Sequence, residues 1–133
     1  MSDKFQVTIL TPERVFVDQQ VSMVTLPAFK GEIGILADHI PVIVKMRAGL
    51  VRLYEGKSVS KTAFAYGGFA EFFDNKLYIL ADIIKEISDL NPTDARTRMK
   101  GLTNKLLTSL DPVHNEQILE EIHVYRKILE IHG

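Results

Sequence analysis

Three side chains that could do chemistry lie close together in the sequence: Glu32, Asp38 and His39. A carboxylate beside a histidine could form a general base or part of a metal site. A catalytic zinc ion needs three protein ligands, and the rest of the β-rich region offers no second histidine. The other histidines, at positions 114, 123 and 132, are spaced so that they are not neighbours on one helical face. The sequence therefore predicts no catalytic residue and no metal site.

Motifs for nucleophilic or nucleotide chemistry are also missing. No serine lies in a G-x-S-x-G turn. Gly67-Gly68 lacks the G-x-x-x-x-G-K pattern of a phosphate loop and precedes no helical pattern, so it indicates a tight turn between strands. The chain has no cysteine, which removes disulfides and thiolate chemistry. We expect no cofactor.

Composition narrows the class of protein further. Apolar residues make up 46% of the 133 residues, enough for a packed core, and the net charge of −1 gives no general attraction to nucleic acid. No apolar run reaches the roughly 18 residues that a transmembrane helix needs. The start of the chain resembles neither a secretory signal nor a transit peptide. We expect a protein that is not exported and that associates with membranes only through partners.

The three polar residues named first fall in a segment punctuated by glycine, residues 31–41. Glycine allows tight turns and positive φ angles, and this segment separates two apolar runs. We predict a loop that exposes Glu32, Asp38 and His39 at one rim of a β-domain. Charged residues on a loop held by rigid strands form a natural contact surface.

The elements that would hold this loop are strands. Phe5, Val7 and Ile9 alternate with polar residues, as in a half-buried strand. Many short runs of this kind, separated by turn signals, predict an antiparallel sandwich or barrel. Further strand-like runs cover residues 14–17, 21–26, 41–46, 50–54, 58–66, 69–73 and 77–81.

The pattern becomes helical after residue 88. Asn91-Pro92 and Asp111-Pro112 each combine a capping residue with a proline suited to the first helical position. The short connection between the two helices predicts an antiparallel hairpin. One apolar stripe is expected on the first helix and two adjacent stripes on the second. These stripes comprise Ala95, Met99, Leu102, Leu106 and Leu110; Ile118, Ile122, Tyr125 and Leu129; and Val113, Val124, Ile128 and Ile131. We predict two domains, residues 1–88 and 89–133.

Charge differs between the helices. The first is basic, with Arg96, Arg98, Lys100 and Lys105 against Asp94, and the second is mostly acidic. Two solvated faces that attract one another weakly explain this pattern without any partner. The functional alternative is a basic strip that meets an acidic partner.

Three motifs in order resemble one protein family. They are Gly31-Glu32-Ile33-Gly34 followed by His39-Ile40-Pro41, then Tyr66-Gly67-Gly68-Phe69-Ala70-Glu71, then Leu80-Ala81-Asp82. With the helical pair, they resemble the epsilon subunit of the F-type rotary ATP synthase, called delta in mitochondria. The resemblance implies an α+β, mainly β fold: a β-sandwich of about ten strands followed by a helical hairpin.

The resemblance also implies a function. Family members are non-catalytic subunits of the central stalk, or rotor, whose sandwich binds the gamma subunit and rests on the polar loops of the membrane-embedded c-ring. Rotation driven by ion flow is thereby coupled to ATP synthesis. By resemblance, Gly31, Glu32, Gly34, Asp38 and His39 fall in the loop that faces the c-ring. A bacterial protein on the cytoplasmic side of the inner membrane is expected, rather than an organellar one.

In bacterial relatives the hairpin can fold down on the sandwich or extend beside gamma and block ATP hydrolysis, so the resemblance implies that the hairpin of this chain is a possible inhibitor of hydrolysis. By resemblance, the four basic residues of the first helix are those proposed to meet an acidic segment of the beta subunit. Some relatives bind ATP through an aliphatic-D-x-x-R-A motif, where this chain has Asn91 in place of aspartate and Asp94 in place of arginine. We predict no regulatory ATP binding.

One alternative from another class is a β-sandwich that binds a carbohydrate or another small ligand. Such a site needs an aromatic platform, but the chain has no tryptophan. Its phenylalanines mostly alternate as core residues do, which argues against this reading.

Overall fold

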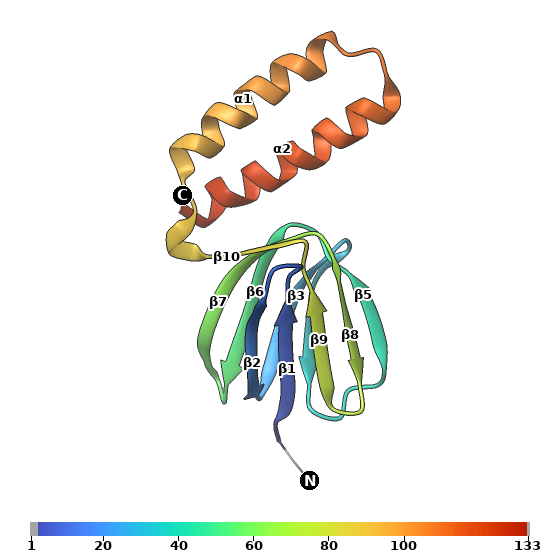
Figure 1. The fold of residues 1–133 in the computed structure, drawn as a ribbon, viewed down its shortest axis with the longest axis vertical. Coiled ribbons are helices and arrows are strands. Elements are labelled where there is room, and N and C mark those ends of the chain that lie inside the picture. Colours follow the sequence, from blue (N-terminus) through green and yellow to red (C-terminus); the bar gives the residue numbers. More distant parts are fainter. Residues whose placement is uncertain (1–2, 133) are drawn as a thin grey trace. The chain divides into compact units, whose positions relative to one another are not determined.

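Alternating apolar side chains build ten β-strands in the first part of the chain, shown in Figure 1. The structure is a computed structural model that describes residues 3–132. The strands are β1 (Phe5–Leu10), β2 (Val15–Val21), β3 (Met23–Ala28), β4 (Gly31–Leu36), β5 (Val42–Lys45), β6 (Gly49–Glu55), β7 (Ser58–Tyr66), β8 (Phe69–Phe73), β9 (Lys76–Leu80) and β10 (Ile83–Glu86).

The strands form two five-stranded sheets. Sheet A has the order β2-β1-β9-β8-β5, and sheet B has the order β10-β7-β6-β3-β4. All described pairings are antiparallel except that of β1 with β9. One apolar cluster from both sheets fills the space between them, including Ile9 and Ile79 of sheet A and Leu26 and Leu53 of sheet B. Closing this core removes apolar surface from water, the main force that holds the sandwich together.

The strand directions give the sandwich two distinct ends. One end, called here the Asn75 end, carries Ser22, residues 37–41, Gly56 and Asn75. The opposite end, called the Gly68 end, carries residues 11–14, 29–30, 46–48, 67–68 and 81–82. The positions of the candidate residues are described below by the end at which they lie.

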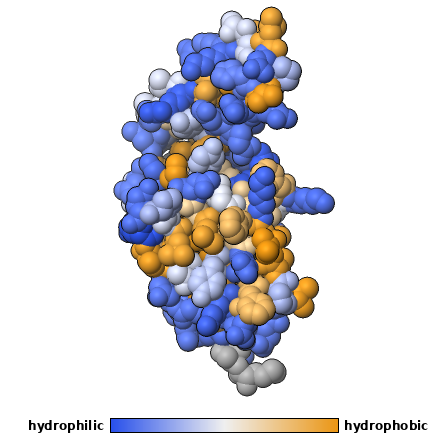
Figure 2. Space-filling view, turned by 45° about the vertical axis from the view of Figure 1, so that its right-hand side comes forward, coloured by the Kyte–Doolittle hydropathy of each residue, from blue (hydrophilic) through white to orange (hydrophobic). Residues whose placement is uncertain are grey.

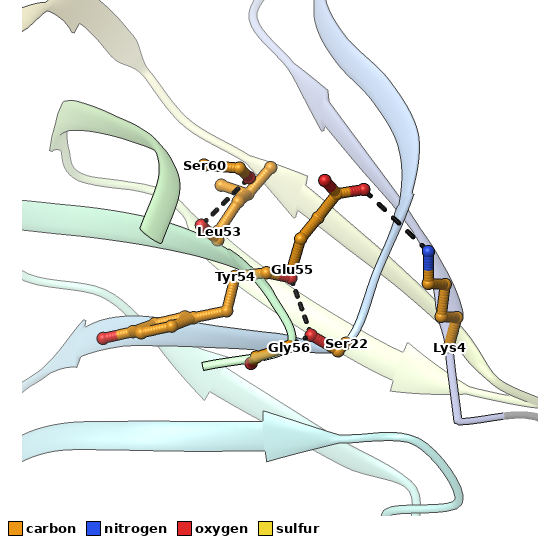
Figure 3. Close-up of polar contacts among 7 residues, drawn as sticks. All are labelled: Lys4, Ser22, Leu53, Tyr54, Glu55, Gly56 and Ser60. Carbon is orange, nitrogen blue, oxygen red and sulfur yellow. Dashed lines mark hydrogen bonds and ion pairs between the residues drawn. The ribbon is translucent and has the colours of Figure 1, made fainter. Parts of the chain in front are cut away.

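The chain crosses between the sheets at both ends. At the Asn75 end, Ser22 joins β2 to β3, and its hydroxyl donates to the carbonyl oxygens of Tyr54 at 2.9 Å and Gly56 at 3.4 Å (Figure 3). At the Gly68 end, residues 46–48 join β5 to β6. There the amide of Met46 donates to the Gly68 carbonyl at 3.0 Å, and the amide of Arg47 donates to the Pro27 carbonyl at 2.9 Å. The two sheets are therefore tied together at both ends.

The helical part begins after a short 3-10 turn, Ile87–Asp89, and contains α1 (Pro92–Thr108) and α2 (Pro112–His132). The Asn91 side chain accepts from the amide of Asp94 at 3.0 Å, and the Asp111 carboxylate accepts from the amide of Val113 at 3.0 Å. Both satisfy amides that a helix start leaves unpaired. The two helices contact each other. The chain divides into two compact units, residues 1–88 and 89–133.

The predicted fold class is confirmed: a mainly β, ten-stranded sandwich followed by a helical hairpin. Two strands were not predicted, β4 and β10. Leu110 was assigned to the stripe of the first helix, but α1 ends at Thr108 and Leu110 is 97% exposed in the connection. Val113, assigned to the second stripe of α2, is also exposed.

Candidate subunit interface

The glycine-punctuated segment is largely a strand. Residues 31–36 form β4, which pairs with β3 and brings Ile35 opposite Val24 and Ile33 opposite Leu26. Ile35 is buried and Ile33 packs on the core cluster, so burial of these two side chains explains why a segment with two glycines forms a strand. The prediction of a loop is wrong for residues 31–36 and holds for the turn after them.

Strand β4 separates the residues that were expected to share one rim. Glu32 lies toward the Gly68 end, whereas Asp38 and His39 lie at the Asn75 end. The strand steps from Glu32 to Leu36 alone span about 13 Å. The prediction that these three side chains lie at a single rim is therefore wrong, and no single flat contact at one end includes all of them.

The end that carries Glu32 is rich in charge. The Glu32 carboxylate accepts from Arg52 at 2.7 Å, an ion pair with both side chains partly exposed. Nearby in the chain, the half-exposed ring of Phe29 lies beneath the cations of Lys45, at 5.4 Å, and Arg47, at 5.3 Å. This aromatic residue with two cations was not predicted. Its parts come from two separate segments, so nothing in the local sequence indicates that they meet.

Asp38 and His39 make contacts that hold the turn between β4 and β5. Asp38 adopts a φ of 65°, and Asn75 both accepts from its amide at 2.6 Å and donates to its carboxylate at 2.8 Å. His39 Nδ1 lies 2.6 Å from the Ile40 carbonyl, which requires a proton on that nitrogen, and its ring meets Phe72 edge to face. These side chains fix the turn to the β8–β9 connection.

The acidic and histidine side chains of the described residues do not gather into a metal site or a reactive cluster. Within residues 3–132, no three histidine, aspartate or glutamate side chains gather as a metal site would require. Glu32, Asp38 and His39 are divided between the two ends, so they do not form one reactive cluster.

The Tyr66–Glu71 motif has a steric explanation. Gly67 and Gly68 have backbone φ values of +71° and +90°, which residues with a side chain rarely adopt. A Cβ atom on Gly68 would lie 1.9 Å from the Leu80 carbonyl oxygen, and one on Gly67 would lie 2.4 Å from the Asp82 carboxylate. The two glycines let the chain turn from sheet B into sheet A beneath the β9–β10 connection.

An apolar surface on the outside of sheet A was also not predicted. Ile43 is 71% exposed and Phe73 is 63% exposed, and Figure 2 shows a band of hydrophobic side chains crossing the sandwich. Phe69 pairs with Leu80 across neighbouring strands on the same outer face. The view that the phenylalanines are core residues is therefore wrong for Phe29, Phe69 and Phe73. The sheet A surface, the name used below, consists of Ile43, Phe69, Phe73, Tyr78 and Leu80.

The four basic residues of α1 do not form a single strip. With 3.6 residues per turn, Arg96 and Lys100 share one side of the helix, and Arg98 and Lys105 lie roughly opposite. Arg98 donates to Asp94 at 3.0 Å. Arg98 donates hydrogen bonds to Tyr125 and to Asp94, and these bonds, that to Tyr125 first, raise the pKa of Arg98 above its ordinary value. Because Tyr125 belongs to α2, Arg98 lies beside α2, and Arg96 and Lys100 lie on the opposite flank of α1.

The two substitutions in the ATP-binding motif have structural roles. Asn91 caps α1, and Asp94 in its first turn pairs with Arg98. A carboxylate near a helix start is favoured by the helix dipole, and it would repel a phosphate placed there. The absence of regulatory ATP binding stays a prediction.

Three large apolar side chains are exposed at the connection between the helices and in the helix ends beside it. Leu107, Leu110 and Val113 are 80%, 97% and 66% exposed. Together they are called the hairpin tip below.

No helix among residues 3–132 combines the length and apolar character needed to cross a bilayer.

Comparison with known proteins identifies the family of the sandwich. A family model described as ATP synthase, Delta/Epsilon chain, beta-sandwich domain matches residues 4–87. Proteins named ATP synthase epsilon chain are similar over more of the chain. The one from Granulibacter bethesdensis is 32% identical over 92% of each chain. That from Dichelobacter nodosus is 34% identical over 84% of this chain and 77% of its own length.

Solved structures share the fold. A chain in the mitochondrial ATP synthase of Euglena gracilis, solved as OSCP/F1/c-ring, superposes with a TM-score of 0.87 at 17% identity and covers 100% of this chain and 84% of its own length. A chain in the central stalk/c-ring of the Tetrahymena thermophila mitochondrial ATP synthase superposes with a TM-score of 0.67 at 14% identity, covering 93% and 95%. At these identities the superpositions support the fold alone.

Proposed function

The chain belongs to the ATP synthase delta/epsilon family, and on that premise we propose that it is a non-catalytic rotor subunit of the central stalk. The observation that carries the proposal is the match of the family model to residues 4–87, together with 32% identity to an epsilon chain over 92% of the sequence. In this role the chain couples ion-driven rotation to ATP synthesis by contact and performs no chemistry. A small-ligand-binding sandwich is not favoured by these relationships.

The sandwich binds the gamma subunit through the sheet A surface in this proposal. Large exposed apolar patches on a soluble domain mark sites of protein association. Ile43 on the edge strand β5 and Phe73 at the end of β8 belong to such a patch, and Figure 2 shows a band of hydrophobic side chains on the sandwich. Burial of these side chains against a second subunit would give a lasting contact, as a rotor needs.

The c-ring contact lies at the end that carries Gly31 and Glu32. The Arg52–Glu32 ion pair and the Phe29 ring with its two cations present polar, charged groups suited to polar loops. This contact uses the Glu32 side chain and leaves the backbone edge of β4, including Gly34, free. Asp38 and His39, which were first grouped with Glu32, have the separate role of fixing the turn at the Asn75 end.

The hairpin regulates hydrolysis in this proposal. Arg96 and Lys100 share one exposed flank of α1, so they can meet an acidic segment of the beta subunit. Arg98 and Lys105 lie on the opposite flank, where Arg98 pairs with Asp94 and contacts Tyr125 of α2. The bacterial relatives favour a peripheral location on the cytoplasmic side of a bacterial inner membrane.

A pull-down of the tagged chain from detergent-solubilised membranes of its source tests the proposal. We expect gamma and c-ring subunits among the captured proteins. Ile43→Glu should abolish capture of gamma, whereas Val59→Glu, which changes an exposed aliphatic residue of sheet B, should not. Capture of neither subunit, with the synthase shown to be intact, would refute the rotor assignment.

The regulatory part is tested by ATP hydrolysis in the assembled complex. Removal of residues 89–133 should raise the hydrolysis rate if the hairpin inhibits. Replacement of Arg96 and Lys100 by glutamate should raise it as well, and Lys105→Glu should have a smaller effect. Equal effects of the two sets of substitutions would contradict a role for one side of α1.

A further inference from the structure

Strand β4 has an open hydrogen-bonding edge. In the described part of the chain its one sheet neighbour is β3, so β4 forms the margin of sheet B. An edge strand presents unpaired amides and carbonyls, which another chain can pair with. The hydrogen bonds of β3 show which residues of β4 have unpaired amides and carbonyls at this edge.

The direction of the free groups can be assigned from Pro27. Its carbonyl accepts from the Arg47 amide on the β6 side of β3, so the backbone groups of Pro27 point away from β4. Because these groups alternate along a strand, those of Val24 and Leu26 point toward β4. Their partners Ile35 and Ile33 point back toward β3. The amides of Glu32, Gly34 and Leu36 therefore point to the open edge.

The other three sheet margins are less available for pairing. Strand β2 carries a register shift in its pairing with β1 and an outward Asp18. Strand β5 has four residues, follows Pro41 and ends at Lys45. Strand β10 also has four residues and ends with Lys85 and Glu86. Short strands, charges, prolines and bulges are the usual means of preventing edge pairing.

Strand β4 carries few of these features. It has six residues, no proline and no register shift in its pairing with β3. Its single charge, Glu32, is paired with Arg52. Gly34 adds no side chain, and a Cβ placed there would meet only the Met23 sulfur at 3.8 Å. An approaching strand therefore meets little steric or electrostatic obstruction.

We propose that the edge of β4 accepts an extended strand of the gamma subunit, which pairs with Glu32, Gly34 and Leu36 and enlarges sheet B. Main-chain pairing at an exposed sheet edge is a common way to recognise an extended segment. The choice of gamma rests on the proposed function. The β4 edge is continuous with the surface proposed to bind gamma. Along the chain, exposed Leu36 and Ile40 connect β4 to Ile43 of the sheet A surface.

The proposal predicts an alternating pattern of amide protection. Hydrogen exchange of the full chain, read residue by residue by NMR, is compared with and without purified gamma subunit. The amides of Glu32, Gly34 and Leu36 should slow by roughly tenfold or more on binding, as expected when a new hydrogen bond forms. The amides of Ile33 and Ile35, already directed at β3, should change much less. A complex with unchanged exchange at Glu32, Gly34 and Leu36 would overturn the proposal.

A matched pair of variants tests the same edge by affinity. Gly34→Pro removes one outward amide, and an outward position is where a strand tolerates proline. Gly34→Ala keeps the amide and adds only a methyl group. Gly34→Pro should weaken gamma binding roughly tenfold, while Gly34→Ala should leave it within about threefold. Equal affinities of the two variants would also count against strand addition.

The outcomes separate this proposal from the proposed function. Binding of gamma without protection at the edge refutes strand addition and leaves the rotor assignment intact. Failure of the unaltered chain to bind gamma refutes both. If Gly34→Pro lowers the thermal midpoint of the free protein, the exchange pattern of the unaltered chain decides the matter.

Discussion

The sandwich and the hairpin use their apolar residues in different ways. In the sandwich, residues far apart in sequence, such as Ile9 and Ile79, meet in one closed core with no exposure. In the hairpin, Leu107, Leu110 and Val113 remain in water at the tip. The sandwich is therefore determined by many non-local contacts, whereas the hairpin depends on two helices of local origin. We expect the first to behave as a rigid body and the second to change partners at low cost.

The largest expected effect is in the core of the sandwich. Ile79→Ala removes a fully buried side chain from the central strand β9 and should lower the free energy of unfolding by about 4 kcal/mol. Urea denaturation followed by circular dichroism measures the loss. Ile122→Ala in α2 is the matched change in the hairpin and should leave the sandwich transition in place. A single transition shifted equally by both variants would remove the distinction between the two regions.

A slightly smaller effect is expected at the turn between the sheets. Gly68→Ala forces a side chain into a positive φ and against the Leu80 carbonyl, at a cost of about 3 kcal/mol. Gly56→Ala is the control, since it also has a positive φ but has open space around the added atom. The difference in thermal midpoint between the two variants isolates the steric part. Equal midpoints would mean that the close approach of Leu80 does not limit this position.

In the hairpin a glycine substitution should have the opposite sign. Gly101 lies in the middle of α1, and a Cβ there would meet no atom within 4 Å. Gly101→Ala should stabilise the helix by about 1 kcal/mol. We expect more helical signal at elevated temperature and an unchanged sandwich transition. A loss of helical signal would show that the added methyl group clashes with a neighbouring group, contrary to the open space around Gly101.

The smallest effect is expected at the exposed Asp94–Arg98 pair. Arg98→Ala should slightly reduce the helical signal of the hairpin at low salt, and added salt should reduce the difference. The pKa of Arg98 is raised, so its contribution is present below the ordinary arginine pKa and is lost only as pH rises through the higher folded value. The effect of the substitution should therefore be constant through the neutral pH range. A change there would point to another titrating group.

The parts that could be predicted from sequence are those with strong local signals. Asn91-Pro92 and Asp111-Pro112 placed both helix starts, because capping and proline geometry act within one turn. Strand β4 was missed because glycine is rare in strands and only Ile33 and Ile35 alternate. Strand β10 was missed because its two isoleucines, Ile83 and Ile84, are adjacent and give no alternation.

The candidate interface was harder to predict than the fold. Alternation shows that Phe69 and Phe73 share one face of a strand, but it does not show whether that face points to the core or to solvent. The Phe29 ring and the Arg47 cation meet only after the chain has folded. The division of Glu32 from His39 likewise depends on β4, which lies between them.

The crossings between the sheets at both ends of the sandwich have a mechanical consequence. Ser22 fastens sheet A to sheet B at one end, and residues 46–48 fasten them at the other, each with backbone hydrogen bonds. Sliding one sheet along the other would have to stretch covalent chain at both ends at once. A twisting load applied to one face should therefore reach the opposite face with little shear, so the domain would act as a stiff spacer that loses little of the transmitted work to internal deformation.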